Sequence, residues 1–186
     1  MRYVYVADSA SADKLGPTIT RLTGDCLYSL IGGLRQSGFG IHTMSDVARR
    51  IREYRSRLLV PTGGSQYIDS GGYSIIRGDV PPQAVRRFIK CYNLYVEHEM
   101  ANYERLFSLD IPFSRKHPTL NTRQTILELN RESLTDMRAM LDSHAQLSSK
   151  LFFVWHFKMA SQYGVWKQLY SELELGRFVK HSRFDH

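Results

Sequence analysis

The sequence predicts an α/β fold built on a parallel sheet. Short β-rich runs alternate with amphipathic stretches of helical period along the 186 residues, and this alternation is typical of parallel α/β structure. No internal repeat or low-complexity segment interrupts it. With 42% hydrophobic and 23% charged residues, the composition is that of a soluble globular domain with one sizeable core.

The N-terminal third predicts two strands and a helix. Residues 3–7 alternate and are rich in β-formers, and residues 25–31 form a second such run before a Gly-Gly break. Ser45 is the candidate N-cap of a helix that continues to about residue 57. Residues 58–60 extend this helix or form a short strand, and a turn follows at 61–64.

The central part predicts two further strands, each followed by a helix. Tyr67 and Ile68 end one strand, and a proline suited to a first helical turn opens a helix over about residues 82–103. A strand over residues 106–109 precedes a long helix that starts at Thr119 or Asn121. The apolar positions expected to face inward are Val85, Phe88, Ile89, Tyr92 and Val96 in the first helix, and Ile126, Leu127, Leu134, Met137 and Leu141 in the second.

The C-terminal part repeats the pattern. The apolar run at residues 151–155 predicts a buried strand. Trp166, Leu169, Tyr170 and Leu173 then recur at helical spacing, and residues 178–179 begin what we interpret as another strand.

One stretch combines a strand end with residues suited to ligand binding. The strand at Tyr67 and Ile68 ends in Asp69, and Ser70-Gly71-Gly72-Tyr73 follows at once. Glycines allow backbone N–H groups to approach a ligand closely, and Tyr73 offers a flat face for stacking. The alternative interpretation is a strand that enters a glycine turn, with Asp69 capping the residues that follow.

Asp69, Asp110 and His156 each follow a predicted strand. In parallel α/β folds ligands bind at the carboxyl ends of strands, and the three residues converge if their strands are neighbours. Each has a plainer interpretation. Asp110 before Ile-Pro caps a turn, His156 is a satisfied strand-end histidine, and Tyr73 is a core residue.

The net charge of +7 and the pI of about 9.5 make a nucleic-acid partner worth considering. The alternative is that the basic residues cover solvated helix faces. They gather in three groups: Arg49, Arg50, Arg52, Arg55 and Arg57; Arg86, Arg87 and Lys90; Arg177, Lys180, His181 and Arg183.

Several classes are disfavoured by the sequence. Cys26 and Cys91 are far apart and form neither a disulfide framework nor a zinc motif, and the histidines lack metal-ligand spacing. No apolar run approaches the length of a membrane span, and the N-terminus reads as a strand rather than a signal peptide. We therefore expect no membrane partner and a cytoplasmic location.

The motif Asp69-Ser70-Gly71-Gly72-Tyr73 resembles the Asp-Ser-Gly-Gly-aromatic motif of the tRNA-guanine transglycosylase superfamily. The Leu-Asp-Ile-Pro stretch at residues 109–112 is more similar to the phage and bacterial branch that puts 7-deazaguanines into DNA. For a phage-encoded member of this branch, the expected cytoplasmic location is the host cytoplasm. The resemblance covers roughly residues 60–160 well and the N-terminus loosely. It implies that residues 1–186 are a single N-terminal portion of a (β/α)8 TIM-barrel-like fold, incomplete at about five to six βα units.

The resemblance also implies a reaction, the exchange of guanine in DNA for a 7-deazaguanine base through a glycosyl-enzyme intermediate. Asp69 matches the acid that transfers protons, Asp110 the acid that recognises the guanine edge, and Tyr73 the aromatic that stacks on the base. Ser70, Gly71 and Gly72 belong to the same base-binding motif. His156 falls where the family often has a glutamine that contacts the base.

Three features of the family have no counterpart in residues 1–186: the nucleophilic aspartate, a glycine-rich strand end and a zinc site. No cofactor is therefore expected. A truncated or split gene product, a fragment and a short non-catalytic relative all remain open. An incomplete barrel exposes a strand edge, so we expect a second chain or self-association.

Alternative functions also remain open. The substrate is tRNA rather than DNA in one alternative, and in another the chain is a non-catalytic nucleic-acid-binding fragment or subunit. In a third, Asp69 and Asp110 bind Mg²⁺ in an unrelated α/β enzyme.

Overall fold

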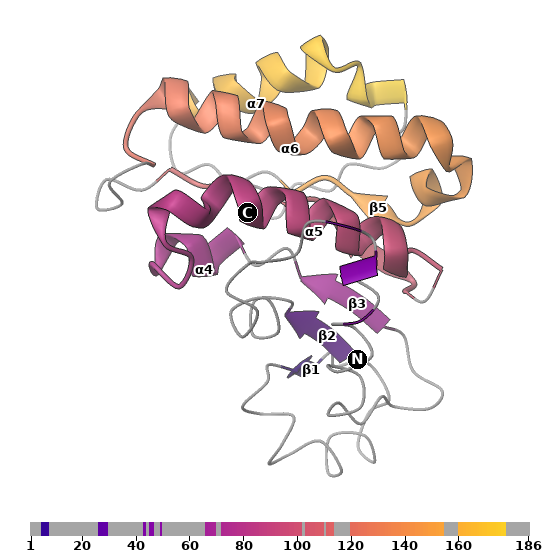
Figure 1. The fold of residues 1–186 in the computed structure, drawn as a ribbon. Helices are drawn as coiled ribbons and strands as arrows, with labels where there is room; N and C mark the ends of the chain where they lie inside the picture. Colours follow the sequence, from indigo (N-terminus) through magenta and orange to yellow (C-terminus); the bar gives the residue numbers. More distant parts are fainter. Residues whose placement is uncertain are drawn as a thin grey trace.

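The structure, a computed structural model, contains five parallel strands among its described residues, with helices packed on one side of them (Figure 1). It describes residues 5–7, 26–29, 43, 45–46, 49, 66–69, 72–101, 103–109, 111–113, 120–154 and 160–177. The strands are β1 (Tyr5–Ala7), β2 (Cys26–Ser29), β3 (Gln66–Asp69), β4 (Arg105–Phe107) and β5 (Leu151–Phe152). Their parallel pairing confirms the α/β class that the alternating sequence pattern predicts.

The strands lie in the sheet in the order in which they occur in the chain. In the parallel register Ile68 of β3 pairs with Leu106 of β4, and Phe107 of β4 pairs with Phe152 of β5. Neighbouring strands in a sheet are about 4.8 Å apart. The carboxyl ends of β3, β4 and β5 therefore open side by side at one edge of the sheet.

The connections between these strands are helical. The chain passes from β3 to β4 through α4 (Gly72–Ile76), the 3₁₀ turn η1 (Pro82–Ala84) and α5 (Val85–Glu99). It passes from β4 to β5 through α6 (Arg123–Ser143) and η2 (Ala145–Ser149), and α7 (Ala160–Glu172) and η3 (Leu175–Arg177) follow β5. In Figure 1, α6 lies between α5 and α7, and all three lie on the same side of β1–β3.

The long helix α6 has two apolar faces, and each packs in a different cluster. Ile126, Met137 and Leu141 belong to a cluster with α5, β4 and β5. Leu127 and Leu134 belong to a second, smaller cluster with α7 and η3. All five were predicted to face inward, and all are buried.

The inward positions predicted for α5 are also confirmed, since Val85, Phe88, Ile89, Tyr92 and Val96 are all buried. However, α5 ends at Glu99 and not near residue 103. The ammonium group of Lys150 donates to the Met100 carbonyl at 3.0 Å, which satisfies a carbonyl at the helix end. The chain then turns back, and the hydroxyl groups of Tyr103 and Tyr95 lie 3.0 Å apart.

Both helix caps lie at residues other than those that the sequence predicted. The hydroxyl of Thr122, not Thr119 or Asn121, accepts a hydrogen bond from the Thr125 N–H at 3.1 Å and caps α6. Near the N-terminus, Thr43 and Asp46 exchange the reciprocal hydrogen bonds of a capping box. Both cases follow the same rule, because the cap is the hydroxyl whose geometry reaches an N–H three residues on.

The strands themselves are close to their predicted positions. β1, β2 and β3 lie within or beside the predicted runs, β4 begins one residue earlier than predicted, and β5 covers the start of the run at residues 151–155. Trp166 and Leu169 of α7 are buried, and so is the side chain of Cys91. Most of the helix predicted over residues 45–57, the segment 58–60 and the strand at 178–179 lie outside the described residues.

Candidate functional site

The motif that follows β3 joins a strand end to a helix start. Asp69 is the last residue of β3, as predicted, and α4 begins at the buried Gly72. The structure thus brings the acid to the carboxyl edge of the sheet. Ser70 and Gly71, and the side chains of Asp69 and Tyr73, lie outside the described part of the structure.

The other two predicted site residues follow the neighbouring strands. Asp110 comes three residues after the end of β4, and His156 four residues after the end of β5. Both lie outside the described residues. The condition set by the sequence, that the three strands be neighbours, is met because the order of strands is β3-β4-β5.

The chain on the far side of Asp110 is held by a buried amide of α6. The Ile111 N–H donates to Oδ1 of Asn130 at 2.8 Å, and Nδ2 of Asn130 donates to the Ile111 carbonyl at 2.9 Å. The same Nδ2 also donates to the Ile126 carbonyl at 2.8 Å. Both Ile111 and Asn130 are fully buried. The amide therefore pairs both backbone groups of a residue that has already left the β-ladder.

The chain on the near side of Asp110 is held as well. The Ser133 hydroxyl, one turn after Asn130 on α6, donates to the Leu109 carbonyl at 3.3 Å. The hydroxyl of Ser108 accepts from the Val154 N–H at 2.9 Å, which extends the contact with the chain after β5. The Tyr92 hydroxyl of α5 donates to the Phe107 carbonyl.

These contacts together make a polar network around the end of β4. Phe107 bonds α5, Ser108 bonds the chain after β5, and residues 109 and 111 both bond α6. Buried polar networks that are satisfied restrict the backbone to one arrangement. The segment that carries Asp110 is consequently flanked by fixed backbone on both sides.

Sequence reasoning missed Asn130 and Ser133. The signal was present, because Asn130 lies four residues after Ile126 and seven before Met137, on the same helical face. A polar residue at such a core position requires a buried partner. The sequence does not say which partner, since the backbone of residues 109–111 is distant in the chain.

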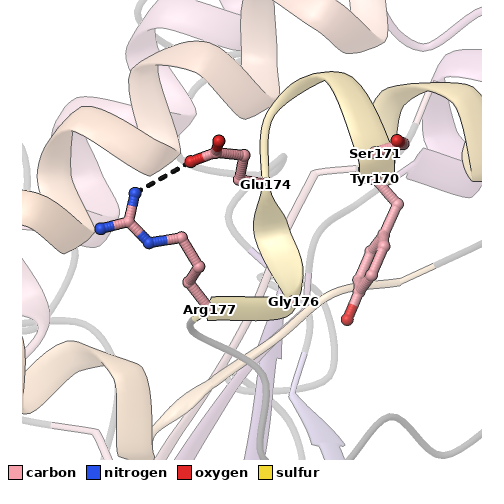
Figure 2. Close-up of a pocket in the computed structure, with 5 residues that line it drawn as sticks. All are labelled: Tyr170, Ser171, Glu174, Gly176 and Arg177. Carbon is pink, nitrogen blue, oxygen red and sulfur yellow. Dashed lines mark hydrogen bonds and ion pairs between the residues drawn. The ribbon is translucent and has the colours of Figure 1, made fainter.

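Two open hollows are found among the described residues. One, of about 670 Å³, is lined by Tyr170, Ser171, Glu174, Gly176 and Arg177 (Figure 2). The other, of about 500 Å³, runs between α5 and α6 and has a mixed charged lining that includes Lys90 and Glu128. In the part of the chain that the structure describes, no group of three or more His, Cys, Asp or Glu side chains is arranged to hold a metal ion.

Ion pairs reduce the free charge of the basic groups. Arg86 pairs with Glu132 of α6. Arg177 pairs with Glu174 at 2.9 Å. Within the described ranges Arg87 and Lys90 are exposed and have no ion-pair partner. In the basic group at residues 86–90 and in the one at residues 177–183, ion pairs therefore neutralise part of the formal charge, and the remainder is left for contacts with phosphate.

Comparisons of the chain with protein-family models, with curated proteins and with solved structures found no match. Among the described residues, no helix has both the length and the apolar character needed to cross a bilayer.

Proposed function

We propose that this chain binds a guanine-type base at the carboxyl edge of its sheet, as part of an enzyme that exchanges guanine for a 7-deazaguanine in DNA. The observation that carries the proposal is the adjacency of β3, β4 and β5, whose ends lead into the segments of Asp69, Asp110 and His156. The sequential order of parallel strands, with helices on one side, is also the order found in a (β/α)8 barrel. We propose that the described sheet is part of such a barrel.

Each residue has a role in this proposal. Asp110 accepts hydrogen bonds from the ring N1–H and the exocyclic NH₂ of guanine, an arrangement that a carboxylate satisfies with its two oxygens. Asp69 transfers a proton to or from the base during exchange. Tyr73 stacks on the base, His156 contacts its edge, and the backbone of Ser70-Gly71-Gly72 lies close to it.

The exchange breaks the bond between the anomeric carbon of the sugar and the base nitrogen, and a carboxylate holds the sugar until the incoming base replaces it. No residue of this chain is assigned as that nucleophile. Base binding is therefore the property to measure in residues 1–186.

Equilibrium dialysis with labelled guanine tests the proposal. Asp110→Asn is expected to weaken binding at least tenfold, because an amide presents an NH₂ donor to the donors of guanine. Asp69→Asn is expected to weaken binding less. Asp136→Asn, at an exposed position of α6, is the control and is expected to bind as the parent does. If Asp110→Asn and Asp69→Asn both bind guanine as tightly as the parent, the assignment of Asp110 is wrong.

Competing ligands distinguish the alternatives. Adenine is expected not to displace guanine, since its Watson–Crick edge presents an acceptor to the carboxylate. Duplex DNA, single-stranded DNA and tRNA, compared at several salt concentrations, show which polymer the chain prefers. Binding of Mg²⁺ that Asp69→Asn and Asp110→Asn abolish, without any binding of guanine, would favour the metal-dependent alternative.

A further inference from the structure

We infer that Asn130 is a positioning residue for base recognition, one that holds the backbone of Ile111, the residue next to Asp110. The inference rests on the proposed function and adds to it a residue that does not touch the base. It starts from the unusual completeness of the contact between Asn130 and Ile111, the residue directly after Asp110.

The amide of Asn130 matches the backbone of Ile111 in both polarity and spacing. Its oxygen accepts from the N–H, and its nitrogen donates to the carbonyl, as a neighbouring strand would. Among side chains of this length only asparagine has a donor and an acceptor fixed side by side, because aspartate lacks the donor and leucine lacks both. The position is therefore specific for the amide rather than for side-chain volume.

The orientation of the amide is itself fixed. The second hydrogen of Nδ2 bonds the Ile126 carbonyl one turn earlier on α6. That contact prevents the amide from rotating without losing a buried hydrogen bond. The rigid helix α6 thus sets the position of Ile111.

Ser133 holds the other flank from the same helix. Its hydroxyl bonds the Leu109 carbonyl, so α6 contacts the residues immediately before and after Asp110. Consecutive Cα atoms are about 3.8 Å apart. The inference is that this anchoring of Leu109 and Ile111 matters for base recognition, because a displacement of about 1 Å at a recognition group costs up to about a hundredfold in function.

The first test compares Asn130→Ala with Met137→Ala. Met137 is also fully buried on α6, but its side chain belongs to the apolar cluster. Asn130→Ala is expected to speed amide hydrogen exchange at Ile111 at least tenfold and to weaken guanine binding at least tenfold. Met137→Ala is expected to leave the guanine Kd within twofold. In an Asp110→Asn background, Asn130→Ala is expected to cause little further loss.

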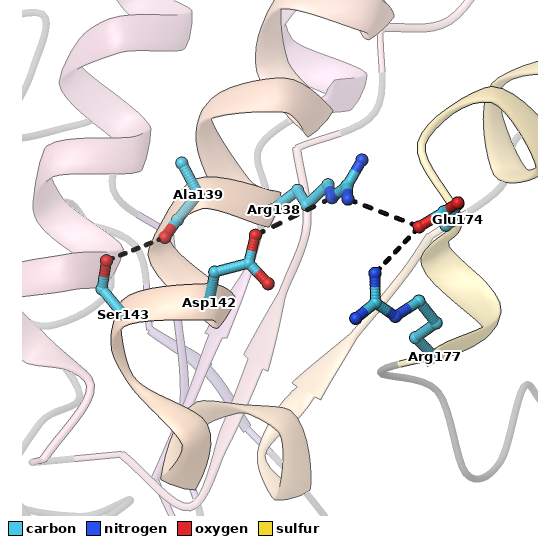
Figure 3. A network of polar contacts seen from close by, with 6 residues as sticks. All are labelled: Arg138, Ala139, Asp142, Ser143, Glu174 and Arg177. Carbon is cyan, nitrogen blue, oxygen red and sulfur yellow. Dashed lines mark hydrogen bonds and ion pairs between the residues drawn. The ribbon is translucent and has the colours of Figure 1, made fainter.

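A second pair keeps the test decisive if Asn130→Ala does not fold. Ser133→Ala removes only the contact with Leu109, whereas Ser143→Ala removes an exposed hydroxyl on the same helix that donates to the Ala139 carbonyl (Figure 3). We expect Ser133→Ala to weaken guanine binding three- to tenfold and Ser143→Ala to leave it unchanged.

The outcomes separate the inference from the proposed function. Equal losses of affinity in Asn130→Ala and Met137→Ala, equal Kd values for Ser133→Ala and Ser143→Ala, or unchanged exchange at Ile111 would overturn the positioning role alone. If the parent chain does not bind guanine, the proposed function fails. Faster exchange at Ile111 in Asn130→Ala would then still show that Asn130 holds this segment.

Discussion

Two buried asparagines on neighbouring helices show how much the partners of a polar side chain decide its effect on stability. All the hydrogen-bonding atoms of Asn130 are paired, and two of its bonds go to Ile111 outside any helix or strand. Asn93 of α5 donates to the Ser133 carbonyl at 3.1 Å, and its buried Oδ1 has no hydrogen-bond partner among the residues that the structure describes. Both side-chain amides are buried, but the amide of Asn130 makes more hydrogen bonds than that of Asn93.

Truncation of the two asparagines is therefore expected to have unequal cost. Asn130→Ala leaves a buried N–H and a buried carbonyl unpaired, and should lower the free energy of unfolding by about 3 kcal/mol. Asn93→Ala removes one donor from a carbonyl inside α6 that still lies within range of a helical N–H. This variant should lower the free energy of unfolding by about 1 kcal/mol. Urea unfolding followed by circular dichroism measures both. Equal losses would show that burial alone, rather than the pairing, sets the cost.

Glu174 carries backbone strain at the end of α7. Its φ is 50°, in the left-handed region that glycine adopts without a steric penalty. Glu174→Gly and Glu174→Ala both remove the ion pairs to Arg138 and Arg177, but only alanine keeps a Cβ. We expect the glycine variant to be more stable than the alanine variant by about 1 kcal/mol, as measured by the midpoint of urea unfolding. An alanine variant that is at least as stable would contradict this account of residue 174.

At the scale of one element, the start of α6 depends on a single hydroxyl. Thr122 caps the helix through the Thr125 N–H, while its exposed neighbour Asn121 makes no such contact with another described residue. Thr122→Ala should lower the free energy of unfolding by about 1 kcal/mol, because loss of an N-cap leaves an N–H unpaired. Asn121→Ala serves as the matched control, and its urea midpoint should coincide with that of the parent. A larger effect at Asn121 would restore it as the cap.

The segment from α7 to η3 is fastened to α6 by carboxylates. Glu172 bonds Gln168 at 2.6 Å and Arg131 at 2.9 Å, and these hydrogen bonds hold the pKa of Glu172 below its usual value. Arg177, through its hydrogen bond and charge, and then Arg138 lower the pKa of Glu174 in the same way (Figure 3). Both carboxylates are therefore more easily ionised in the folded protein than in the unfolded chain.

The sign of the pH dependence follows from these lowered pKa values. The stabilisation is fully present above the unfolded-state pKa of a glutamate, about 4.3, and is lost as the pH falls through the folded-state pKa. Thermal unfolding of the parent and of the double variant Glu172→Gln/Glu174→Gln should differ at pH 6 and converge at pH 3. Glu104→Gln, at an exposed glutamate without an ion pair among the described residues, should give no such convergence. A difference in thermal unfolding between the two proteins that is constant with pH would mean that ionisation of these carboxylates does not stabilise the segment from α7 to η3.

The elements that sequence pattern predicts well are those whose signal is local. The apolar faces of α5 and α6 are confirmed residue by residue, because helical period and burial are properties of one segment. The class of the sheet and the acid at the end of β3 were predicted for the same reason. The caps at Thr43 and Thr122 were missed because several hydroxyl or amide residues lie close together, and only the backbone path selects one of them.

The rest of the candidate site depends on contacts between distant segments. Nothing near Asn130 in the sequence indicates that it pairs the backbone of Ile111, 19 residues earlier. The carbonyl of Met100, at the early end of α5, is likewise bonded by Lys150, which is 50 residues away in the chain. The roles of Asp69 and Asp110 in binding a base remain predictions.

At the scale of the whole molecule, α6 joins two apolar clusters of unequal size. The larger cluster includes α5, β4, β5 and one face of α6. The smaller consists of Leu127, Leu134, Val165, Trp166, Leu169 and Leu175, with a few half-buried neighbours. Phe153 packs against both. Since local stability follows the amount of buried apolar contact, α7 and η3 should open at a lower free energy than α5 and α6.

Matched core truncations on the two faces of α6 test this division. Leu134 lies in the smaller cluster and Met137 in the larger, and both are at least 98% buried. With Trp155→Phe in the background, Trp166 becomes the sole tryptophan and its fluorescence reports the smaller cluster. Leu134→Ala should move the fluorescence transition to lower urea than the transition in circular dichroism. Met137→Ala, at a cost of about 2–5 kcal/mol, should move both transitions together, because α7 has no support once α6 unfolds. If Leu134→Ala also shifts both transitions by the same amount, the two clusters unfold as one cooperative unit. Loss of packing on either face of α6 then destabilises the whole sheet.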